Sequence, residues 1–404
     1  MRDKADTTGE PVPAGTSRPP ARRPGGAARK VTAFVSALAL LATIGSWVGW
    51  SAINGVESNL TVDRSLGRLL TGAGAQAEPG SYSALNILVV GSDTRTGQGT
   101  QYGSTKDYAG NGHSDTAFLL HISADRHFAY AVSIPRDSWV TRPGCKADGS
   151  IDSTFVTGKF NTAFAVGGRA CVIAAVKYLT GVPIDHFVDV EFSGFKAIVD
   201  ALGGVTICTT HALSDPVRPD GSGGFEGSNL NLPKGVSHID GEQALELVRA
   251  RHIGDGSDLE RIDRQHKFMS AMIREAATAG LLTDPLKLYD VLSSVARSLT
   301  VDAGLTGDGL KSFLLSLQGL KPADVMFSTV PNVPRGDGAN VVWVAKGAAA
   351  IWSAMTHDRP YPSPAVRPSP TSAARGTTAT PRPSPTASST GAPGLAASDT
   401  SCIS

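Results

Sequence analysis

Short apolar runs and amphipathic stretches alternate through the middle of the chain, from about residue 85 to about residue 358. Apolar runs of a few residues that end at glycine or proline are typical of buried strands. They predict strands at 86–90, 116–122, 127–134, 205–209 and 326–330. Helical patterns at 170–180 and 192–202 each end at glycine, the residue that a helix C-cap favours. The mixture predicts an α/β (α+β) sandwich, in which helices flank a central mixed β-sheet.

Three more helices are predicted toward the C-terminal half. Two begin after residues that suit a helix N-cap: Asp240, with Gln243 three positions on, and Ser257, with Glu260 three positions on. Both pairs fit the capping-box pattern, the second more closely. The third helix is predicted at 342–355 and closes the domain.

The segment Val31–Ile53 contains 23 residues without a charge. A helix of that length spans roughly 34 Å, enough to cross a bilayer. Basic residues precede the segment and acidic residues follow it, so the positive-inside rule places the N-terminus in the cytoplasm and the rest of the chain outside. The alternative is a cleaved signal peptide, but the cleavage-like sequence Ala75-Gln76-Ala77 lies far beyond the apolar core. We therefore expect a single-pass, uncleaved anchor in the cell membrane.

The segments around this anchor lack the pattern of a folded domain. Residues 1–30 carry seven Lys/Arg against three Asp/Glu and are expected to be a disordered cytoplasmic tail. Residues 54–84 are expected to form a juxtamembrane stalk and 85–358 the folded domain. Residues 359–404, rich in Pro, Ser and Thr, are expected to be a disordered tail. The net charge of +1 gives no general attraction to nucleic acid.

Four cysteines occur, at positions 145, 171, 208 and 402, and none forms a C-x-x-C pair. A zinc ribbon or a thioredoxin-type site is therefore not indicated. Disulfides become feasible if the domain lies outside the membrane. We favour a bond between Cys145 and Cys171, with separate buried thiols as the alternative.

Two aspartates lie at the ends of predicted strands. Asp93 follows the first strand and Asp115 begins the next. Two carboxylates at one edge of a sheet could hold Mg²⁺, which takes one or two carboxylates and leaves its other positions to water and phosphate oxygens. Taken singly, each aspartate is more typical of a turn or a cap. The sequence contains no P-loop, dinucleotide-binding, nucleophile-elbow or H-E-x-x-H motif.

Arginines add a candidate phosphate site. Arg136 follows a predicted strand, Arg249 and Arg251 end a predicted helix, and Arg261, Arg264 and Gln265 share one face of the next helix. The structural alternative is a set of solvated ion pairs with Glu246, Glu260 and Asp263. Gathered in one cleft, however, these guanidiniums would bind a pyrophosphate, because an arginine fork contacts phosphate oxygens bidentately and stays charged.

A series of motifs in this order resembles the LytR-CpsA-Psr family of cell-wall glycopolymer ligases, from about Asn86 to about Met272 and more weakly to Met355. The motifs are Asn86-Ile-Leu-Val-Val-Gly-Ser-Asp-Thr-Arg95, Ser114-Asp-Thr116, Val132-Ser-Ile-Pro-Arg-Asp137, Lys159-Phe-Asn-Thr-Ala-Phe164, Leu179-Thr-Gly-Val-Pro-Ile-Asp-His186, Val199-Asp-Ala-Leu-Gly-Gly-Val205, Leu247-Val-Arg-Ala-Arg251 and Gly256-Ser-Asp-Leu-Glu-Arg-Ile-Asp-Arg-Gln265. Phe160 and His266 depart from the residues common at their positions.

The resemblance implies a role for each matching position. Asp93 and Asp115 match magnesium-binding aspartates, with Mn²⁺ as a substitute ion. Arg136, Arg249 and Arg251 match pyrophosphate-binding arginines, and Gln265 matches a glutamine of the same head-group site. Arg95, Lys159, Arg261 and Arg264 also fall on motif positions of this substrate site. Asp93 is the candidate general base, although a metal-bound carboxylate is a poor base.

The resemblance implies a phosphotransferase that moves a glycan from a polyprenyl-pyrophosphate carrier to peptidoglycan, at the C6 hydroxyl of muramic acid. Such a step depends mainly on positioning and charge stabilisation. Two alternatives stay open: a hydrolase of lipid pyrophosphates that uses the same site, and a non-enzymatic wall-binding or regulatory membrane protein. The second predicts no metal dependence and tolerance of Arg249→Ala.

Overall fold

The computed structural model describes residues 59–70, 83–92, 114–219, 225–254, 256–281, 291, 293, 295–317, 320–362 and 394–404. All of them belong to one compact unit, which extends from residue 52 to residue 404. The predicted cytoplasmic tail, the predicted anchor and two predicted site residues, Asp93 and Arg95, lie outside the described residues.

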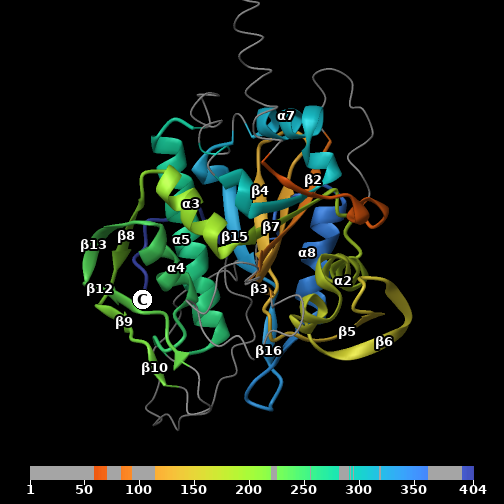
Figure 1. Ribbon diagram of the computed structural model, residues 1–404, viewed down its shortest axis with the longest axis horizontal. Coiled ribbons are helices and arrows are strands. Elements are labelled where there is room, and N and C mark those ends of the chain that lie inside the picture. Colours follow the sequence, from red (N-terminus) through yellow and green to blue (C-terminus); the bar gives the residue numbers. More distant parts are fainter. Residues whose placement is uncertain are drawn as a thin grey trace, which may run out of the picture. The chain divides into compact units, whose positions relative to one another are not determined.

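A mixed sheet of eight strands forms the centre of the described fold (Figure 1). Across the sheet the order is β1 (Thr61–Asp63), β14 (Leu299–Asp302), β7 (His186–Glu191), β2 (Leu85–Ser92), β3 (Ser114–Ile122), β4 (Ala129–Ser133), β15 (Val325–Thr329) and β18 (Leu395–Ala396). β3 is antiparallel to both β2 and β4, whereas β7 is parallel to β2 and β15 is parallel to β4. The start of β3 and the ends of β2, β4 and β7 therefore meet at one edge of the sheet.

Helices cover both faces of this sheet (Figure 1). The core on one face joins β2, β3 and β4 to α2 (Thr162–Thr180) and α8 (Ala345–Thr356). On the other face lie α5 (Asp258–Thr278) and α7 (Gly307–Ser316). Alternate residues of β2 enter the two cores, so the middle of the strand, residues 87–90, is continuously apolar. The predicted sandwich with a central mixed sheet is confirmed.

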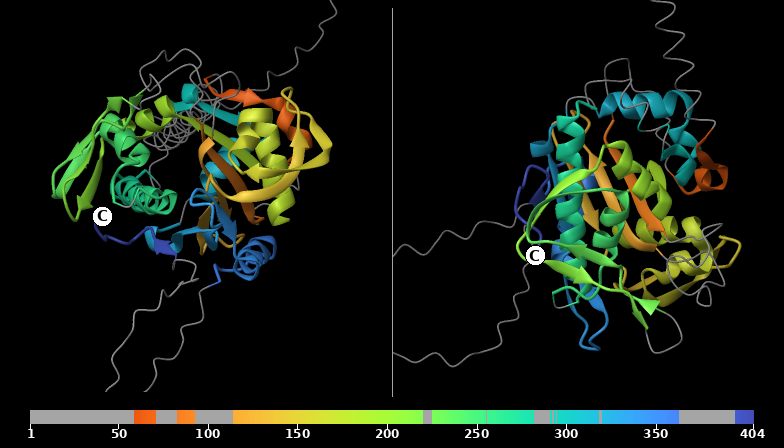
Figure 2. Two further views of the ribbon diagram at one scale, coloured as in Figure 1. Left: turned by 90° about the horizontal axis from the view of Figure 1, so that it is seen from below. Right: turned by 60° about the vertical axis from the view of Figure 1, so that its left-hand side comes forward.

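A second lobe is built on the outer side of α5 (Figure 2). It consists of α3 (Phe192–Ala201), α4 (Gly241–Arg249) and the strand pairs β8 (Val205–Thr209) with β13 (Gly235–Ile239) and β9 (Leu213–Asp215) with β12 (Leu230–Leu232). Another short pair joins β10 (Arg218–Pro219) to β11 (Phe225–Glu226). The lobe has its own apolar core, to which α5 contributes Phe268. α5 thus belongs to both cores.

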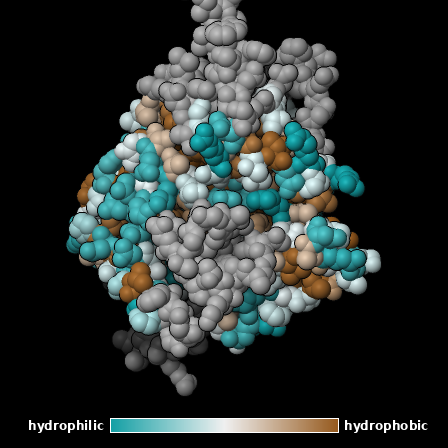
Figure 3. Space-filling model, in the orientation of Figure 1, coloured by the Kyte–Doolittle hydropathy of each residue, from teal (hydrophilic) through white to brown (hydrophobic). Residues whose placement is uncertain are grey.

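The sequence did not reveal two hairpins. One joins β5 (Trp139–Cys145) to β6 (Ile151–Lys159), and the other joins β16 (Asn332–Pro334) to β17 (Val341–Trp343). The surface over β5 and β6 carries exposed apolar side chains (Figure 3). Among them, Phe155 contacts Tyr178 of α2 with ring centroids 5.0 Å apart. Because β6 is mostly exposed, it lacks the alternation that identifies a half-buried strand.

The starts of α4 and α5 follow the predicted capping residues. At α4 the Asp240 carboxylate accepts a hydrogen bond from the backbone N–H of Gln243, and the Gln243 side chain accepts one from the backbone N–H of Asp240. At α5 the Ser257 hydroxyl accepts a hydrogen bond from the backbone N–H of Glu260. These caps fix where both helices begin, which matters because the chain between them carries site residues.

Two predicted helices have different bounds in the structure. The helix predicted at 170–180 begins at Thr162, because it continues through a kink at Gly167 and Gly168. A Cβ on Gly167 would lie 2.9 Å from that of Cys145, so the close approach requires glycine. The helix predicted at 342–355 begins only at Ala345, because Val341–Trp343 pair with Asn332–Pro334 as a strand.

Two disulfides occur in the described structure. Cys145 is bonded to Cys171, the pairing that the sequence favours, and Cys208 is bonded to Cys402. The second bond was not predicted, and with it the end of the chain returns to the domain. Leu395–Ala396 pair with β15, and Ile403 bridges to Thr209. Assigning residues 394–404 to a disordered tail was therefore wrong.

The predicted stalk also contributes to the domain. β1 lies parallel to β14, and the 3-10 helix η1 (Arg64–Arg68) buries Leu66 in the core beside α2. Further 3-10 helices are η3 (Ala296–Ser298), η4 (Ala303–Leu305) and η5 (Pro322–Asp324). Among the described residues one helix, α2, is long and apolar enough to cross a membrane. Its buried residues belong to the core, so we interpret it as a core helix.

Candidate active site

The predicted site residues that the structure describes gather at one edge of the sheet. Asp115 lies at the start of β3, and Arg136 lies three residues after β4 ends. Arg251 comes from the loop after α4, and Arg261 from the first turns of α5. The first and last of these residues, Asp115 and Arg261, are 146 positions apart in the sequence, and the sheet and the second lobe bring the group together.

Arg136 is the centre of the cluster. Its Nη1 lies 2.9 Å from Oδ1 of Asp115, and its Nε lies 3.3 Å from Oδ2 of Asp137 and 3.4 Å from Oδ1 of Asp258. Asp115 and Asp258 thus sit at different edges of one guanidinium group. Burial by itself lowers the pKa of Arg136, but the three carboxylates outweigh burial and raise it. Arg136 is therefore a permanent cation held in a fixed orientation.

Arg251 and Arg261 add positive charge on either side. Arg251 Nη2 lies 3.3 Å from Asp115 Oδ1, and half of its side chain is exposed. Arg261 is almost buried, and its Nη2 contacts Asp258 Oδ1. The exposed Arg251 guanidinium is accessible to an anion from solvent, whereas Arg261 mainly neutralises Asp258.

Two of the three carboxylates that contact Arg136, those of Asp115 and Asp258, have pKa values shifted in opposite directions. For Asp115, burial by itself raises the pKa, but Arg251, Arg136 and Arg261 outweigh it and hold the pKa below its usual value. For Asp258, burial raises the pKa, and the neighbouring guanidiniums do not fully compensate. Carboxylates with opposite shifts in one site commonly have different chemical roles. Asp115 stays ionised, while Asp258 has the greater affinity for a proton.

The remaining predicted residues surround this centre. Lys159 Nζ lies 2.8 Å from Asp137 Oδ1, and Arg249 stacks on the Phe192 ring at 4.9 Å from its centroid. Gln265 donates to the carbonyl of Val248, 3.1 Å away. Phe192, at the start of α3, is a positioning residue for Arg249 that its place in an apolar run did not reveal.

The environment of Arg264 differs from what we expected of a substrate-binding residue. Its side chain is buried, and its Nη2 donates to the carbonyl of Ala250 at 2.7 Å. Ala250 lies between Arg249 and Arg251, so this bond fixes the backbone that carries both arginines. The helical spacing correctly placed Arg264 near the site, but a guanidinium turned toward a backbone carbonyl supports the loop.

Asp215, at the end of β9, also holds the Arg251 loop, and the sequence gave no signal for it. Its Oδ2 accepts hydrogen bonds from two backbone N–H groups, that of Arg251 at 3.0 Å and that of Ser228 at 3.2 Å. Its Oδ1 lies 2.8 Å from Nδ1 of His252. Only 1% of this side chain is exposed. Burial alone raises the pKa of Asp215, but the hydrogen bonds from His252, Arg251 and Ser228 outweigh burial and lower it.

We expect Asp215→Asn to lower the free energy of unfolding by about 1–3 kcal/mol, the cost typical of disrupting hydrogen bonds to a buried charged group. Because the folded-state pKa of Asp215 is depressed, its contribution is complete above the unfolded value of about 4 and is lost as the pH falls through the folded value. Urea titrations at pH 7 and at decreasing pH should show the gap between the two proteins closing. The exposed substitution Asp148→Asn is the control, and a gap that persists at low pH would contradict this account.

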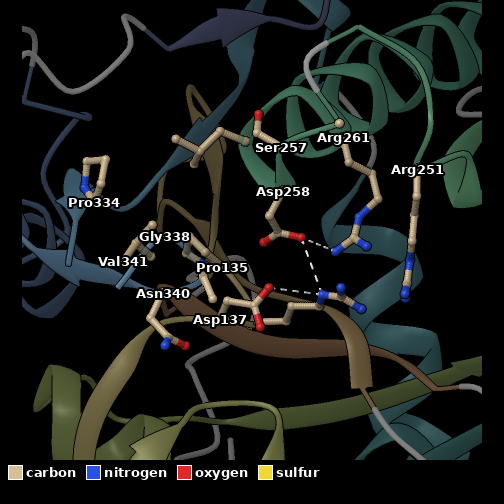
Figure 4. A pocket seen from close by; sticks show the side chains of 14 residues that line it. Pro135, Asp137, Arg251, Ser257, Asp258, Arg261, Pro334, Gly338, Asn340 and Val341 are labelled. Atoms are coloured by element: carbon tan, nitrogen blue, oxygen red, sulfur yellow. Dashed lines mark hydrogen bonds and ion pairs between the residues drawn. The ribbon is translucent and has the colours of Figure 1, made fainter. Parts of the chain in front are cut away.

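A cavity of about 330 Å³ opens beside the cluster (Figure 4). One wall consists of Arg136, Asp137 and the start of α5, and the facing wall is the β16–β17 hairpin. The lining residues are Pro135, Arg136, Asp137, Arg251, Gly256, Ser257, Asp258, Leu259, Arg261, Pro334, Gly338, Ala339, Asn340 and Val341. The hairpin wall and both Asp137 and Asp258 were missing from the predicted site.

Comparisons with known proteins agree with this architecture. The model of the LytR_cpsA_psr family matches residues 62–357. The cell wall biosynthesis protein LcpA of Corynebacterium glutamicum is 33% identical over 326 residues, 75% of this chain and 59% of that protein. The polyisoprenyl-teichoic acid–peptidoglycan teichoic acid transferase TagU of Oceanobacillus iheyensis is 30% identical over 260 residues, 64% of this chain and 70% of that protein.

A solved structure shares the fold. The LytR-Csp2A-Psr enzyme from Actinomyces oris superposes with a TM-score of 0.52 at 19% identity, covering 74% of this chain and 96% of that one. This chain spans 59% and 60% of the lengths of two curated relatives from Corynebacterium glutamicum. The family match covers most of the chain and contains every described residue of the arginine cluster. The chain belongs to the LytR_cpsA_psr family.

Proposed function

We propose that this protein is a phosphotransferase that attaches a glycopolymer to peptidoglycan. The donor is a glycan on a polyprenyl-pyrophosphate carrier, and the acceptor is the C6 hydroxyl of muramic acid. The observation that carries the proposal is the cluster of Arg136, Arg251 and Asp115 at the sheet edge. The family match and the relative named as a teichoic acid transferase support it.

Arg136 and Arg251 bind the pyrophosphate in this proposal. The acceptor oxygen bonds to the phosphorus next to the glycan, and the bond from that phosphorus to the bridging oxygen breaks. Polyprenyl phosphate leaves with the bridging oxygen. Guanidiniums that are already oriented by carboxylates stabilise the growing negative charge without reorganising. Arg249, on its aromatic support, is placed to assist.

Mg²⁺ is the cofactor that we propose, and the described residues offer it one carboxylate, Asp115. Both ion pairs to Asp115 use Oδ1, so Oδ2 is the oxygen for a cation. One carboxylate together with substrate phosphates and water suits Mg²⁺. No group of three His, Cys, Asp or Glu side chains converges within the described part of the chain, and Asp93 lies outside it. When bound, the ion would neutralise phosphate charge.

Chelation with EDTA should reduce transfer to background, and added Mg²⁺ should restore it. Asp115→Asn should raise the Mg²⁺ concentration needed for half-maximal activity by at least about 10-fold, as expected for loss of a ligating carboxylate. Mass spectrometry of the glycan–phosphate–muramic acid conjugate provides the measurement. Transfer that is insensitive to EDTA would contradict the metal proposal and leave the arginine cluster as the source of charge stabilisation.

The same experiment separates the alternatives. Release of polyprenyl phosphate without a conjugate, when acceptor is supplied, would identify a hydrolase. Lipid binding without either product, unaffected by EDTA and by Arg249→Ala, would identify a non-enzymatic binding protein.

We also propose that the domain lies outside the cytoplasmic membrane, anchored by residues 31–53. Two disulfides support this placement, because such bonds persist in oxidising compartments. The basic residues before the segment support the same orientation. Labelling of intact cells with a membrane-impermeant lysine reagent tests it, since Lys346 and the half-buried Lys159 should react only if the domain faces outward.

A further inference from the structure

The cavity beside the arginine cluster has two walls of different chemistry. The charged wall includes both arginines of the proposed pyrophosphate site and consists of Arg136, Asp137, Arg251, Asp258 and Arg261. The other wall is the β16–β17 hairpin, which contributes small and apolar groups such as Pro334 and Val341. A sugar ring, with polar edges and apolar faces, fits such a combination. The volume of about 330 Å³ is at the small end of ligand pockets.

The hairpin wall is held rigidly against the site. The backbone N–H of Val341 donates to the carbonyl of Asp137 at 3.2 Å. The indole N–H of Trp343 donates to the hydroxyl of Ser138 at 2.9 Å, and Arg335 lies over the Trp139 ring. These contacts tie the hairpin to the strand that follows Arg136. The cavity therefore exists without a conformational change.

Two buried oxygens in this cavity accept no hydrogen bond from the described residues: Oδ2 of Asp258 and Oδ1 of Asn340. Asn340 is 9% exposed, and its Nδ2 donates to Asp337 Oδ2 at 2.7 Å, which settles the orientation of its amide. Buried polar atoms in folded proteins are almost always hydrogen-bonded. Two unsatisfied acceptors in one cavity point to a ligand that brings two donors.

Asp258 is oriented by its other oxygen. Oδ1 contacts both Arg261 and Arg136, whereas Oδ2 points away from these guanidiniums toward the hairpin side of the cavity (Figure 4). Arg136 contacts Asp115 through Nη1 and Asp258 through Nε. The cavity and the proposed pyrophosphate site therefore join, because Arg136 and Arg251 belong to both.

We infer that this cavity binds the acceptor sugar, an N-acetylated hexosamine, and that Oδ2 of Asp258 accepts the proton of its attacking hydroxyl. The inference rests on the proposed transferase function. Asn340 Oδ1 accepts a hydrogen bond from the acetamido N–H of the same sugar. As the hydroxyl oxygen bonds to phosphorus, its proton passes to Asp258, and polyprenyl phosphate departs on the far side of Arg136.

The electrostatics of Asp258 suit this role. Burial raises the pKa of Asp258, so it is a better base than an exposed aspartate. The charged groups around it come from three parts of the fold. They are Arg261 on α5, Arg136 and Asp137 after β4, and Asp115 on β3. The transfer rate should therefore rise with pH through the Asp258 pKa and then level off.

The base role is tested with the full chain in lipid nanodiscs, a synthetic polyprenyl-pyrophosphate glycan and a peptidoglycan disaccharide. Asp258→Asn should lower kcat at least about 100-fold, the usual contribution of a general base, and the acidic limb of the pH profile should be absent. Asp258→Glu should keep that limb. Asp263→Asn, on the exposed face of the same helix, is the control. A wild-type rate and pH profile in Asp258→Asn would overturn the base assignment.

The binding site is tested without donor, by saturation-transfer NMR with the disaccharide N-acetylglucosaminyl-N-acetylmuramic acid. Asn340→Leu should weaken the signal and raise the acceptor KM about 10-fold, the value of one lost hydrogen bond. Asn332→Leu, on the same hairpin but outside the cavity lining, should change neither. Equal signals in all three proteins would overturn the site. Loss of signal in Asn340→Leu without any transfer by wild type would refute the transferase instead.

Discussion

Replacing Arg136 with alanine should lower the rate of glycopolymer transfer by at least about 100-fold, the loss typical for one oriented donor to a developing charge. The expected loss is large because Arg136 lies within ion-pair distance of three carboxylates. Its removal leaves Asp115 and Asp258 without their shared counter-ion. We therefore expect weaker donor binding together with a lower kcat, measured by conjugate formation over a range of donor concentrations.

Arg136→Lys distinguishes geometry from charge. A lysine retains the positive charge but offers a single nitrogen, which cannot contact Asp115 and Asp258 at different edges of a planar group. We expect most of the activity to be lost in this variant as well. Arg297→Ala, at an exposed arginine beside Asn59, is the control and should behave as wild type. Full activity in Arg136→Lys would mean that charge alone matters at this position.

Removing the bond between Cys208 and Cys402 should give the largest loss of stability among simple substitutions. In the chain-entropy account, closing a loop of 194 residues is worth about 5 kcal/mol, against about 3.5 kcal/mol for the 26-residue separation of Cys145 and Cys171. The double variant Cys208→Ser/Cys402→Ser should therefore unfold at lower denaturant than wild type and than Cys145→Ser/Cys171→Ser. Equal midpoints for the two double variants would contradict the expectation that the longer loop gives the larger stabilisation.

The bond between Cys208 and Cys402 also holds the second lobe. Cys208 lies in β8, and Ile403 bridges to Thr209 of the same strand. The lobe carries Arg249 and Arg251, so loss of the bond should reduce donor affinity in addition to stability. Donor binding measured well below the melting temperature checks this expectation.

The sequence predicted the parts of the fold that have strong local signals. β2 contains a continuous apolar run at residues 87–90, and α4 begins at a capping residue three positions before glutamine, so both could be located from the chain alone. β6 could not, because it is exposed on both faces and gains its order by pairing with β5. Strand pairing by itself leaves no periodic signal in the sequence of an exposed strand.

The candidate site was likewise predicted only in part. Arg136 and Asp115 were found because they stand in motifs at strand ends, where functional residues gather. Asp258 and Asn340 were missed for different reasons. Asp258 reads as an ordinary acidic residue in the first turn of a helix, which favours negative charge there. Asn340 reads as a turn residue. Only the folded structure, in which the hairpin faces the start of α5 across the cavity, shows that both residues line one cavity.

The return of the chain end to the domain changes the topology of the Pro/Ser/Thr-rich segment. Residues up to 362 and from 394 onward are part of the fold, and Cys402 is covalently bound to it. The chain between residues 362 and 394 is therefore attached covalently to the fold at both ends, within the loop that the bond between Cys208 and Cys402 closes. A protease that cuts within this loop would release no fragment under oxidising conditions. The two pieces would separate only after reduction, and an affinity tag placed after Ser404 would still recover the whole protein.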